Sequence, residues 1–585
     1  MGTNHLLVAI VIISMTFKLA FCQDNTDNIY AINGVNIITM TSEEIIVNQT
    51  VLVKGNRIIG INDLDKVKIP DEALIIDGTG KYLIPGLADM HTHYGETLDY
   101  SYLNLFAAYG VTTIRDLPQG YPATLLKMRD EIRSGKRFGP QIIVANHLMG
   151  NETDPSSSIQ PTGRSGYDGV KLNSHFTADE FKETVAEANK CGLYTLGHIP
   201  FTVDIEDLLA SGYQESSHVL ELTWYLAEID RELIGSPQEA EERTLTNLFT
   251  QFSGIYNLSD DEIEKLYRAK IKSIVGKIAD SGLSFTTTLI TDYDIMKKML
   301  DIESIKNSDY SNYISSTFWN KLQSGKDKHI NLFEHKEYAR LVYKISCMLF
   351  KELVENDILL VLGTDVGPTY LSYIPGLSVH DELKLLVENG LTPYQALLTS
   401  TRNASIISKK MCGADDFGTI EVGKRSDLVL LENNPLDDIA NTRNITGVLI
   451  HGNYYEKTRL DSIKNIRKEG IRPYLTDVYE KEGIDETVKH YYSFKEENYF
   501  NEYFYNENTL LIIAYELLNK NLFEDAIKLF ALNTKEYPYS SNAFDSLGEA
   551  YLKSGNKELA IENYEKSLEL DPQNNNAREI MKTLK

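Results

Sequence analysis

Residues 86–93 read Gly86-Leu-Ala-Asp-Met-His-Thr-His93, a short apolar run that ends in two histidines one residue apart. Such a run is typical of a buried β-strand. Side chains two residues apart on an extended chain point to the same face, so His91 and His93 can bind one metal ion together. Taken alone, a pair of this kind more often caps a strand beside a loop. The rest of the chain has to decide between the two interpretations.

Four further polar residues stand at or near the ends of segments that also read as buried strands. Between these segments lie amphipathic stretches with helix signals, such as Thr177 followed three residues later by Glu180, the pattern of a capping box. Strands that alternate with helices predict a parallel sheet covered by helices, here a (β/α)8 barrel over residues 84–412. The carboxyl ends of all strands in such a barrel meet at one mouth. The four residues are Lys171, His198, His218 and Asp365.

Segments on both sides of the predicted barrel alternate with period two, as hairpin strands do. They lie in 23–83 and in 413–458, so we expect a composite β-sandwich domain built from both flanks. The charged stretch 459–505 reads as a linker. In 506–585 apolar and small residues recur with a spacing of 34, the period of tetratricopeptide repeats. The predicted fold is α/β with an all-α tail, which serves either a protein or peptide partner or as an inert spacer.

The composition limits the classes of partner. The chain has 58 Lys and Arg against 84 Asp and Glu, a formal net charge of -26. A charge of this size repels nucleic acid and anionic membrane surfaces, so a small-molecule substrate is expected. The 4 cysteines are too few and too scattered for a disulfide framework or a thiolate zinc site. Any metal ligands must therefore be histidines and carboxylates.

The first residues predict export. The apolar run from Leu6 to Phe17 is too short to span a membrane, but it suits a signal peptide over 1–22. This indicates a periplasmic or extracellular protein with no transmembrane segment in the mature chain. Lipid attachment at Cys22 is the less favoured alternative, because Phe21 is bulky where a lipoprotein signal wants a small residue.

In order along the chain, several motifs resemble those of the amidohydrolase superfamily. Leu83-Ile-Pro-Gly-Leu-Ala-Asp-Met-His-Thr-His is similar to its first-strand signature, and Gly197-His-Ile-Pro and Gly363-Thr-Asp-Val-Gly are similar to its fifth and eighth strands. Gly418-Thr-Ile-Glu-Val-Gly-Lys-Arg-Ser-Asp-Leu-Val then follows as in imidazolonepropionase-like and prolidase-like members. The resemblance covers residues 30 to 455 and implies a metal-dependent hydrolase of carbon–nitrogen bonds in amides or cyclic amides.

The resemblance also implies a role for each candidate residue. Lys171 would bridge two divalent metal ions, with zinc expected, as a carbamate formed with carbon dioxide, because an unmodified ammonium has no lone pair to offer. The plainer interpretation is a partly buried strand lysine whose amine reaches solvent. Asp365 would serve a metal-activated hydroxide as general base and return the proton to the leaving nitrogen. One metal would be held by His91, His93 and Asp365, and the other by His198 and His218.

One position departs from the family pattern. Members with this architecture usually carry glutamate directly before the sixth-strand histidine, and here that residue is Ser217. Histidine ligands commonly donate their second N–H to a carboxylate. The orientation of His218 is therefore expected to depend on some other acid or on a carbonyl. Glu215, two residues before Ser217, would share its face of the strand.

Three residues near the predicted mouth are candidates for substrate binding. Arg115 either clamps a substrate carboxylate or forms a structural pair with Asp116. His147 follows a strand-like segment, and His380 comes after the last metal-bearing strand, where it either contacts substrate or caps a helix. The long stretch from Thr223 to Gly325 is expected to hold the seventh strand and to contribute a lid.

Two other functions stay open at this stage. One is a non-catalytic exported scaffold, which a missing ligand would favour, and none of the six is missing. The other is a one-metal deaminase of the same superfamily, which has no need of Lys171. The favoured substrates are a dipeptide, an N-acyl amino acid or a small cyclic amide.

Overall fold

The structure is a computed structural model of the 585-residue chain. It describes residues 28–584 apart from 67, 94–99, 119–121, 151–158, 160, 161, 164, 228, 230, 232–236, 309, 312, 313, 315, 326, 328, 331–335, 368–370, 465–470, 498–506, 572 and 573. The predicted signal peptide and Cys22 lie outside the described residues. Among the helices that are described, none has the length and apolar character needed to cross a bilayer.

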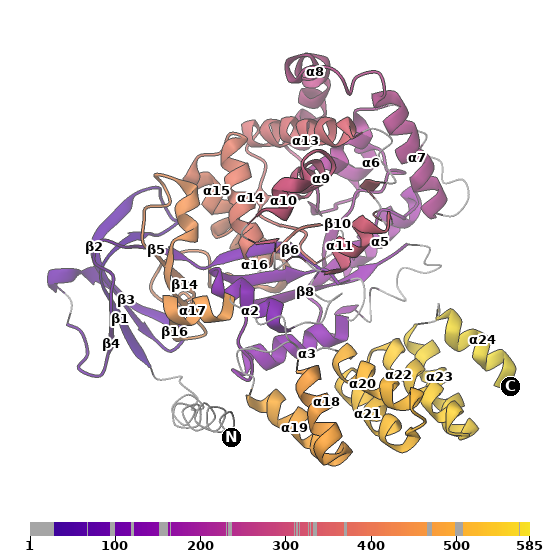
Figure 1. Ribbon diagram of the computed structural model, residues 1–585. Coiled ribbons are helices and arrows are strands. Elements are labelled where there is room, and N and C mark those ends of the chain that lie inside the picture. Colours follow the sequence, from indigo (N-terminus) through magenta and orange to yellow (C-terminus); the bar gives the residue numbers. More distant parts are fainter. Residues whose placement is uncertain are drawn as a thin grey trace.

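Eight parallel strands, β6 to β13, form a barrel at the centre of the molecule in the order of the chain (Figure 1). The barrel closes where β6 meets the chain that follows β13. There the N–H of Met90 donates to the carbonyl of Leu362 and the N–H of Asp365 to the carbonyl of His91, each at 2.8 Å. The predicted (β/α)8 barrel is confirmed. The strands are β6 (Leu87–Thr92), β7 (Val111–Asp116), β8 (Gln141–Leu148), β9 (Gly169–Leu172), β10 (Tyr194–Gly197), β11 (Glu215–Ser216), β12 (Ser284–Thr286) and β13 (Leu360–Val361).

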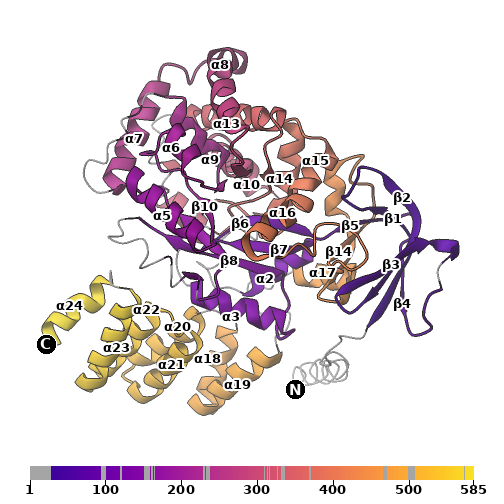
Figure 2. The same cartoon turned by 180° about the vertical axis from the view of Figure 1, so that it is seen from behind.

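Helices surround the barrel strands on the outside (Figures 1 and 2). The capping box predicted at Thr177 is present: its hydroxyl accepts the N–H of Glu180 and starts the helix after β9. A second capping box, formed by Thr392 with Gln395, starts a later helix at its first-turn proline. The helices are α2 (Tyr100–Ala108), α3 (Pro122–Arg133), α5 (Ala178–Lys190), α6 (Ile205–Ala210), α7 (Pro237–Phe252), α8 (Asp260–Ile278), α9 (Leu289–Leu300), α10 (Ile302–Lys306), α11 (Ser316–Gln323), α13 (Glu337–Glu355), α14 (Leu377–Glu388), α15 (Pro393–Thr399) and α16 (Arg402–Cys412).

The stretch expected to contribute a lid is largely helical. α7 and α8 lie between β11 and β12, and α9, α10 and α11 follow β12. Glu241 of α7 accepts a hydrogen bond from the Ser174 hydroxyl at 2.9 Å and lies 2.8 Å from Nε2 of His175. Ser174 and His175 come directly after β9, so these contacts fasten α7 to the rim of the barrel. A lid movement of this part stays a prediction.

Strands from both flanks of the barrel pair in one composite sheet, where two sheets packed as a β-sandwich were expected (Figure 1). Its order is β16-β15-β14-β5-β1-β2-β3, with β4 also paired to β1. Ile58 of β3 and Leu449 of β15 share one apolar core although they lie near opposite ends of this order, so the sheet bends around that core. The strands are β1 (Ile29–Ile38), β2 (Ile45–Lys54), β3 (Arg57–Asp63), β4 (Leu74–Asp77), β5 (Tyr82–Pro85), β14 (Leu428–Leu431), β15 (Ile445–Ile450) and β16 (Asn453–Glu456).

The C-terminal helices form a group of their own outside the barrel (Figures 1 and 2). α20 (Glu507–Asn519) and α22 (Ser541–Lys553) start 34 residues apart, and so do α21 (Phe523–Glu536) and α23 (Lys557–Leu570), which agrees with the predicted period. Gly548 is small because a Cβ there would lie 3.2 Å from the ring of Tyr564. The last helix is α24 (Asn575–Leu584).

The stretch expected to be a linker is helical in the part that is described. It contains α18 (Arg472–Glu482) and α19 (Ile484–Glu497), while α17 (Lys457–Lys464) precedes them. Leu475 of α18 and Tyr491 of α19 belong to the same apolar core as Leu510 and Phe530 of the repeats. These two helices are therefore packed as part of the repeat unit.

A buried ion pair crosses the interior of the barrel. The guanidinium of Arg115 in β7 donates to both carboxylate oxygens of Glu215 in β11, and neither side chain is exposed. Nε of Arg115 also donates to the Met90 carbonyl at 2.6 Å. The hydroxyls of Tyr194 and Thr286 donate to Glu215 from β10 and β12, at 3.1 and 2.6 Å. One polar layer thus joins five of the eight strands.

We predict that Glu215→Ala lowers the free energy of unfolding by about 3–5 kcal/mol, because it leaves the Arg115 charge buried and uncompensated. Urea unfolding followed by the fluorescence of Trp224 and Trp319 measures this change. Glu264→Ala, which breaks an exposed pair with Arg268, should change little. Equal unfolding free energies for Glu215→Ala and the wild type would show that the pair does not support the barrel.

Candidate metal centre

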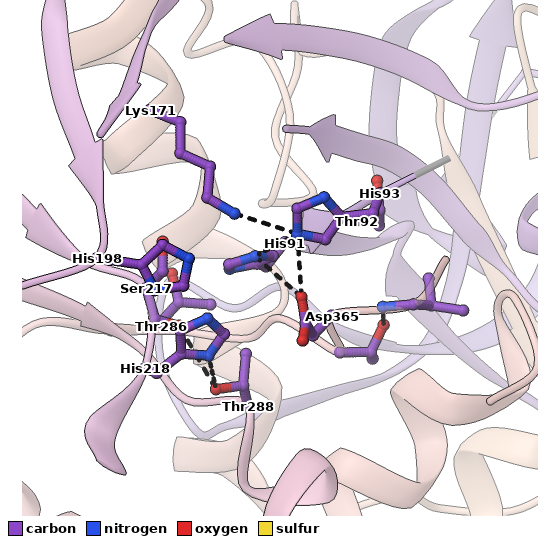
Figure 3. A network of polar contacts seen from close by, with 12 residues as sticks. His91, Thr92, His93, Lys171, His198, Ser217, His218, Thr286, Thr288 and Asp365 are labelled. Carbon is purple, nitrogen blue, oxygen red and sulfur yellow. Dashed lines mark hydrogen bonds and ion pairs between the residues drawn. The ribbon is translucent and has the colours of Figure 1, made fainter. Parts of the chain in front are cut away.

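Five histidine and carboxylate side chains and one lysine come together at the carboxyl ends of the barrel strands (Figure 3). Nε2 of His91 and Nε2 of His93 lie 3.2 Å apart. Oδ1 of Asp365 lies 3.2 Å from the first and 3.1 Å from the second. Three ligand atoms from β6 and from the chain after β13 therefore form a compact triangle.

The backbone around Asp365 is shaped for this approach. Asp365 has a left-handed φ of 59°, which aspartate tolerates better than most residues. Two residues earlier, a Cβ on Gly363 would lie 2.6 Å from Cβ of His91 and 2.3 Å from Cγ2 of Thr286. Only glycine lets the chain after β13 come this close to β6. The Gly-Thr-Asp order of the motif thus has a steric cause.

Asp89, two residues before His91 in β6, holds the same two segments together. Its carboxylate accepts the N–H and the hydroxyl of Thr364 at 3.0 and 2.6 Å and the N–H of His91 at 3.2 Å. Burial raises the pKa of Asp89 to about 7, although these hydrogen bonds oppose the rise. Asp89 therefore fixes both the strand that carries His91 and the residue before Asp365.

A second group consists of His198, His218 and Glu221. The rings of His198 and His218 are stacked with centroids 5.1 Å apart, and His218 lies 4.8 Å from the ring of His91. Nδ1 of His198 lies 2.5 Å from Oε1 of Glu221, and Nδ1 of His218 lies 3.0 Å from the hydroxyl of Thr288. With these outer nitrogens engaged, Nε2 of each ring is the atom left to bind a metal.

Lys171 lies between the two groups. It is fully buried in β9, and its Nζ lies 3.1 Å from Nε2 of His93. The interpretation of Lys171 as a strand lysine with a solvated amine is therefore wrong. Carboxylation of the amine stays a prediction, and the position suits a group that reaches both sets of ligands (Figure 3).

The first group fits a divalent ion in size as well as in chemistry. Ligand atoms around a tetrahedral zinc with bonds of about 2.0–2.1 Å are separated by roughly 3.3 Å. The three separations among His91, His93 and Asp365 are 3.1 to 3.2 Å. Two imidazoles and one carboxylate are a donor set that zinc and similar ions prefer.

The protonation states also suit metal binding. Burial, together with the charge of Lys171, lowers the pKa of His198 to about 3, and burial lowers that of His218 to about 4. Both rings are therefore neutral at pH 7 and offer a lone pair. Burial opposes ionisation of Asp365, but its contacts with His91 and His93 outweigh burial and hold its pKa well below the usual value. Asp365 thus supplies the first group with a carboxylate anion.

Two of the three residues expected to bind substrate lie elsewhere. Arg115 is wrong as a substrate clamp because Glu215 occupies its guanidinium inside the barrel, and its partner is not Asp116. His380 is wrong as well, since it lies in α14 with its ring held by the Thr442 hydroxyl at 2.9 Å and the Tyr109 carbonyl at 3.0 Å. Both side chains are buried and already saturated by the protein.

His147 lies close to the metal ligands. It is the register partner of Lys171 in the neighbouring strand, and its Nε2 lies 3.2 Å from Nδ2 of Asn173. Its Nδ1 is buried and has no hydrogen-bond partner among the described residues. Burial and the charge of Lys171 lower its pKa, so the ring is neutral. Contact between His147 and a substrate stays a prediction.

The sequence motifs did not predict most of the residues that hold the candidate metal ligands in place. Glu221 and Thr288, which hold the outer nitrogens of His198 and His218, stand in no motif. Glu215 shares a strand face with Ser217, as expected, but pairs with Arg115 instead of serving His218. The position of Asp89 gave no signal either, because the irregular pairing of β6 between Asp89 and Thr92 breaks the alternation of side chains along the strand.

Comparisons with known families agree with this site. Residues 263–454 match the model of the amidohydrolase family, and residues 546–574 match that of the tetratricopeptide repeat. These two matches agree with the predicted family, with the predicted class of hydrolase and with the predicted repeats.

Solved structures share the fold. A prolidase-like protein from Bifidobacterium longum is 19% identical with a TM-score of 0.51, covering 75% of this chain and 98% of its own. A Xaa-Pro dipeptidase with bound methionine is 17% identical with a TM-score of 0.51, covering 73% and 100%. Molinate hydrolase is 16% identical with a TM-score of 0.51, covering 74% and 96%.

A shorter similarity is to the adenine deaminase of Staphylothermus marinus. It is 30% identical over 87 residues, which is 14% of this chain and 14% of the deaminase. The match thus spans about a seventh of the deaminase's length, so it says nothing of shared activity.

We predict that His380→Gln weakens the acid sensitivity of the fold. Burial lowers the folded-state pKa of His380 from 6.5 to about 3. Its contribution to stability is therefore present above pH 6.5 and is lost as the pH falls towards 3, because only the unfolded chain takes up the proton. This single group costs ~1.4 kcal/mol per pH unit below its unfolded pKa.

Urea unfolding between about pH 7 and pH 4.5 tests this slope. The glutamine variant should lose stability less steeply than the wild type, since its amide can still donate to the Tyr109 carbonyl. Parallel curves for the two proteins would contradict the assignment.

Proposed function

We propose that the protein is a binuclear metal hydrolase that cleaves carbon–nitrogen bonds of amides. The observation that carries the proposal is the pair of adjacent ligand groups, with the triangle of His91, His93 and Asp365 on one side and His198 with His218 on the other. Lys171 lies between them, where a carbamate would bridge two ions. If only one metal ion were bound, one of these two groups would bind no metal.

Two divalent ions at such a site would acidify an attacking water and polarise the scissile carbonyl. The chain supplies neutral imidazoles that hold the ions and a buried strand lysine that can be carboxylated. It also supplies a carboxylate that can move a proton. His91, His93 and Lys171 are buried, which keeps them away from bulk water.

Asp365 is the general base in this proposal. Its Oδ1 makes the contacts with His91 and His93, while Oδ2 has no partner among the described residues. Oδ2 is therefore free to accept a proton from the attacking water and to pass it to the leaving nitrogen. The left-handed backbone at Asp365 and the anchor through Thr364 and Asp89 fix the direction in which this carboxylate points.

The proposed substrates are a dipeptide, an N-acyl amino acid or a small cyclic amide, which the motif resemblance to prolidase-like and imidazolonepropionase-like members supports. Deamination by a single metal is the alternative, and it would have no need of Lys171. Export by the N-terminal segment and a partner for the repeats remain part of the proposal.

Metal analysis and a substrate screen test the proposal together. Protein purified with zinc should contain two equivalents per chain and should hydrolyse at least one dipeptide, N-acyl amino acid, lactam or hydantoin. One equivalent with release of ammonia from adenine would favour the deaminase. No bound metal after growth in metal-rich medium would overturn both enzymatic functions.

We predict that Lys171→Ala loses bound metal and activity together, because the bridge between the two ligand groups disappears. Lys171→Met, which keeps most of the buried volume, should show the same loss, which separates the missing amine from a packing defect. Metal content by mass spectrometry and turnover are measured side by side. Full turnover by either variant would show the carbamate assignment to be wrong.

We predict that Asp365→Asn lowers kcat by about 10²–10⁴-fold, the usual contribution of a positioned general base. The second group, His198 with His218, should still bind its metal in this variant. The pH dependence of turnover provides the check, since the acidic limb that belongs to Asp365 should vanish. An unchanged acidic limb would assign the base to another residue.

A further inference from the structure

We infer that Glu221 is the positioning residue of the second metal group, that it orients His198 without binding the metal itself, and that it makes the two histidines of this group chemically unequal. The inference rests on the proposed function, because it presupposes that His198 and His218 bind a metal. It assigns a role to a residue outside every motif of the chain.

One carboxylate fixes both the ring and the backbone of His198. Oε1 of Glu221 lies 2.5 Å from Nδ1 of His198, so the ring donates this N–H to the carboxylate. Oε2 accepts the backbone N–H of Ile199, the next residue, at 2.7 Å, and the hydroxyl of Ser216 at 3.4 Å. With Nδ1 protonated, the lone pair of the ring is on Nε2, which faces the other ligands.

Glu221 is also tied to the second histidine of the group. It lies in the 3₁₀ turn from Val219 to Tyr225, and His218 directly precedes that turn. The N–H of Glu221 donates to the carbonyl of His218 at 3.3 Å. Glu221 therefore links His198 to the backbone of His218, in addition to the pairing of β10 with β11.

Glu221 is close enough to both rings to be considered a ligand. Its contacts argue against that role. Oε1 lies against Nδ1 of His198, on the opposite side of the ring from Nε2, and Oε2 is held by a backbone N–H. A metal on Nε2 of His198 is thus out of reach of the carboxylate while these hydrogen bonds persist.

The partner of His218 is different in kind. Nδ1 of His218 meets the neutral hydroxyl of Thr288, which precedes α9. An anion behind an imidazole raises its basicity more than a hydroxyl does. His198 is therefore the stronger donor of the two, and most of the metal affinity of this group depends on Glu221.

The same contacts explain how the chain tolerates Ser217. A carboxylate at position 217 is not needed for His218, because Thr288 occupies its outer nitrogen. The acid that supports this metal group stands four residues later and serves the neighbouring strand instead. Glu215, the other acid nearby, is committed to Arg115.

The test is the metal affinity of Glu221→Gln in the full-length protein. Zinc is removed from each variant by competition with a chelator of known affinity, and the two equivalents are followed separately. Glu221→Gln should bind one equivalent about 10–100-fold more weakly and keep the other. Thr288→Val should weaken the same equivalent by a smaller factor.

Glu382→Gln is the matched control. Glu382 is also a fully buried carboxylate of the barrel, it accepts the N–H groups of Leu289 and Ile290 at 3.0 and 2.7 Å, and it contacts none of the ligands. Its variant should keep both affinities. The metal-free form of Glu221→Gln should unfold at the temperature of the metal-free wild type or above, which a merely structural role would not allow.

The outcomes separate the two levels of the proposal. A wild-type protein that binds no metal overturns the proposed function. A wild type with two equivalents and a Glu221→Gln variant with unchanged affinities overturns only the role of Glu221. Loss of both equivalents with equal severity would also contradict it, because the effect would then not be confined to the group of His198. Cobalt-substituted protein gives a second readout, since a changed absorption spectrum reports a changed ligand field.

Discussion

The site depends on the hydrogen bonds that close the barrel. Between Met90 and Leu362 and between His91 and Asp365, β6 pairs with a chain segment that follows it by more than half the length of the barrel. Without this closure the two histidines and the aspartate would be on opposite edges of an open sheet. Asp89 strengthens the same junction, since it joins Thr364 to His91. The geometry of the candidate ligands therefore depends directly on the closure of the barrel.

Much of the architecture could be read from the sequence because it follows from local rules. The alternation of strands and helices predicted the barrel, and the capping box of Thr177 with Glu180 predicted the start of a helix. The period of 34 residues predicted the helices of the C-terminal repeats. The candidate ligands could be predicted as one group because the strand ends of a barrel meet at one mouth, whatever their separation in the chain. His91, His93, Lys171, His198, His218 and Asp365 do come together.

The side-chain partners that the sequence did not predict come from segments that meet only in the folded structure. Arg115 and Asp116 are neighbours in sequence, yet successive side chains of a strand point to opposite faces, and only Arg115 enters the barrel interior to meet Glu215. His380 follows β13 in the sequence, but it belongs to α14, where Thr442 and the carbonyl of Tyr109 hold its ring. Glu221 serves a histidine 23 positions earlier. The spacing of residues in the sequence does not predict such pairs. They depend on the register of neighbouring strands and on where a turn begins.

The composite sheet sets an order of events during synthesis. One edge of β5 pairs with β1, and the other edge pairs with β14. Since β14 follows the barrel in the sequence, it is synthesised only after the whole barrel. For that time the edge from Tyr82 to Pro85 exposes unpaired backbone groups next to the strand that carries the first histidines. The chain must keep this edge from pairing with another molecule. The composite sheet is therefore completed by β14, β15 and β16 only after the barrel has been synthesised.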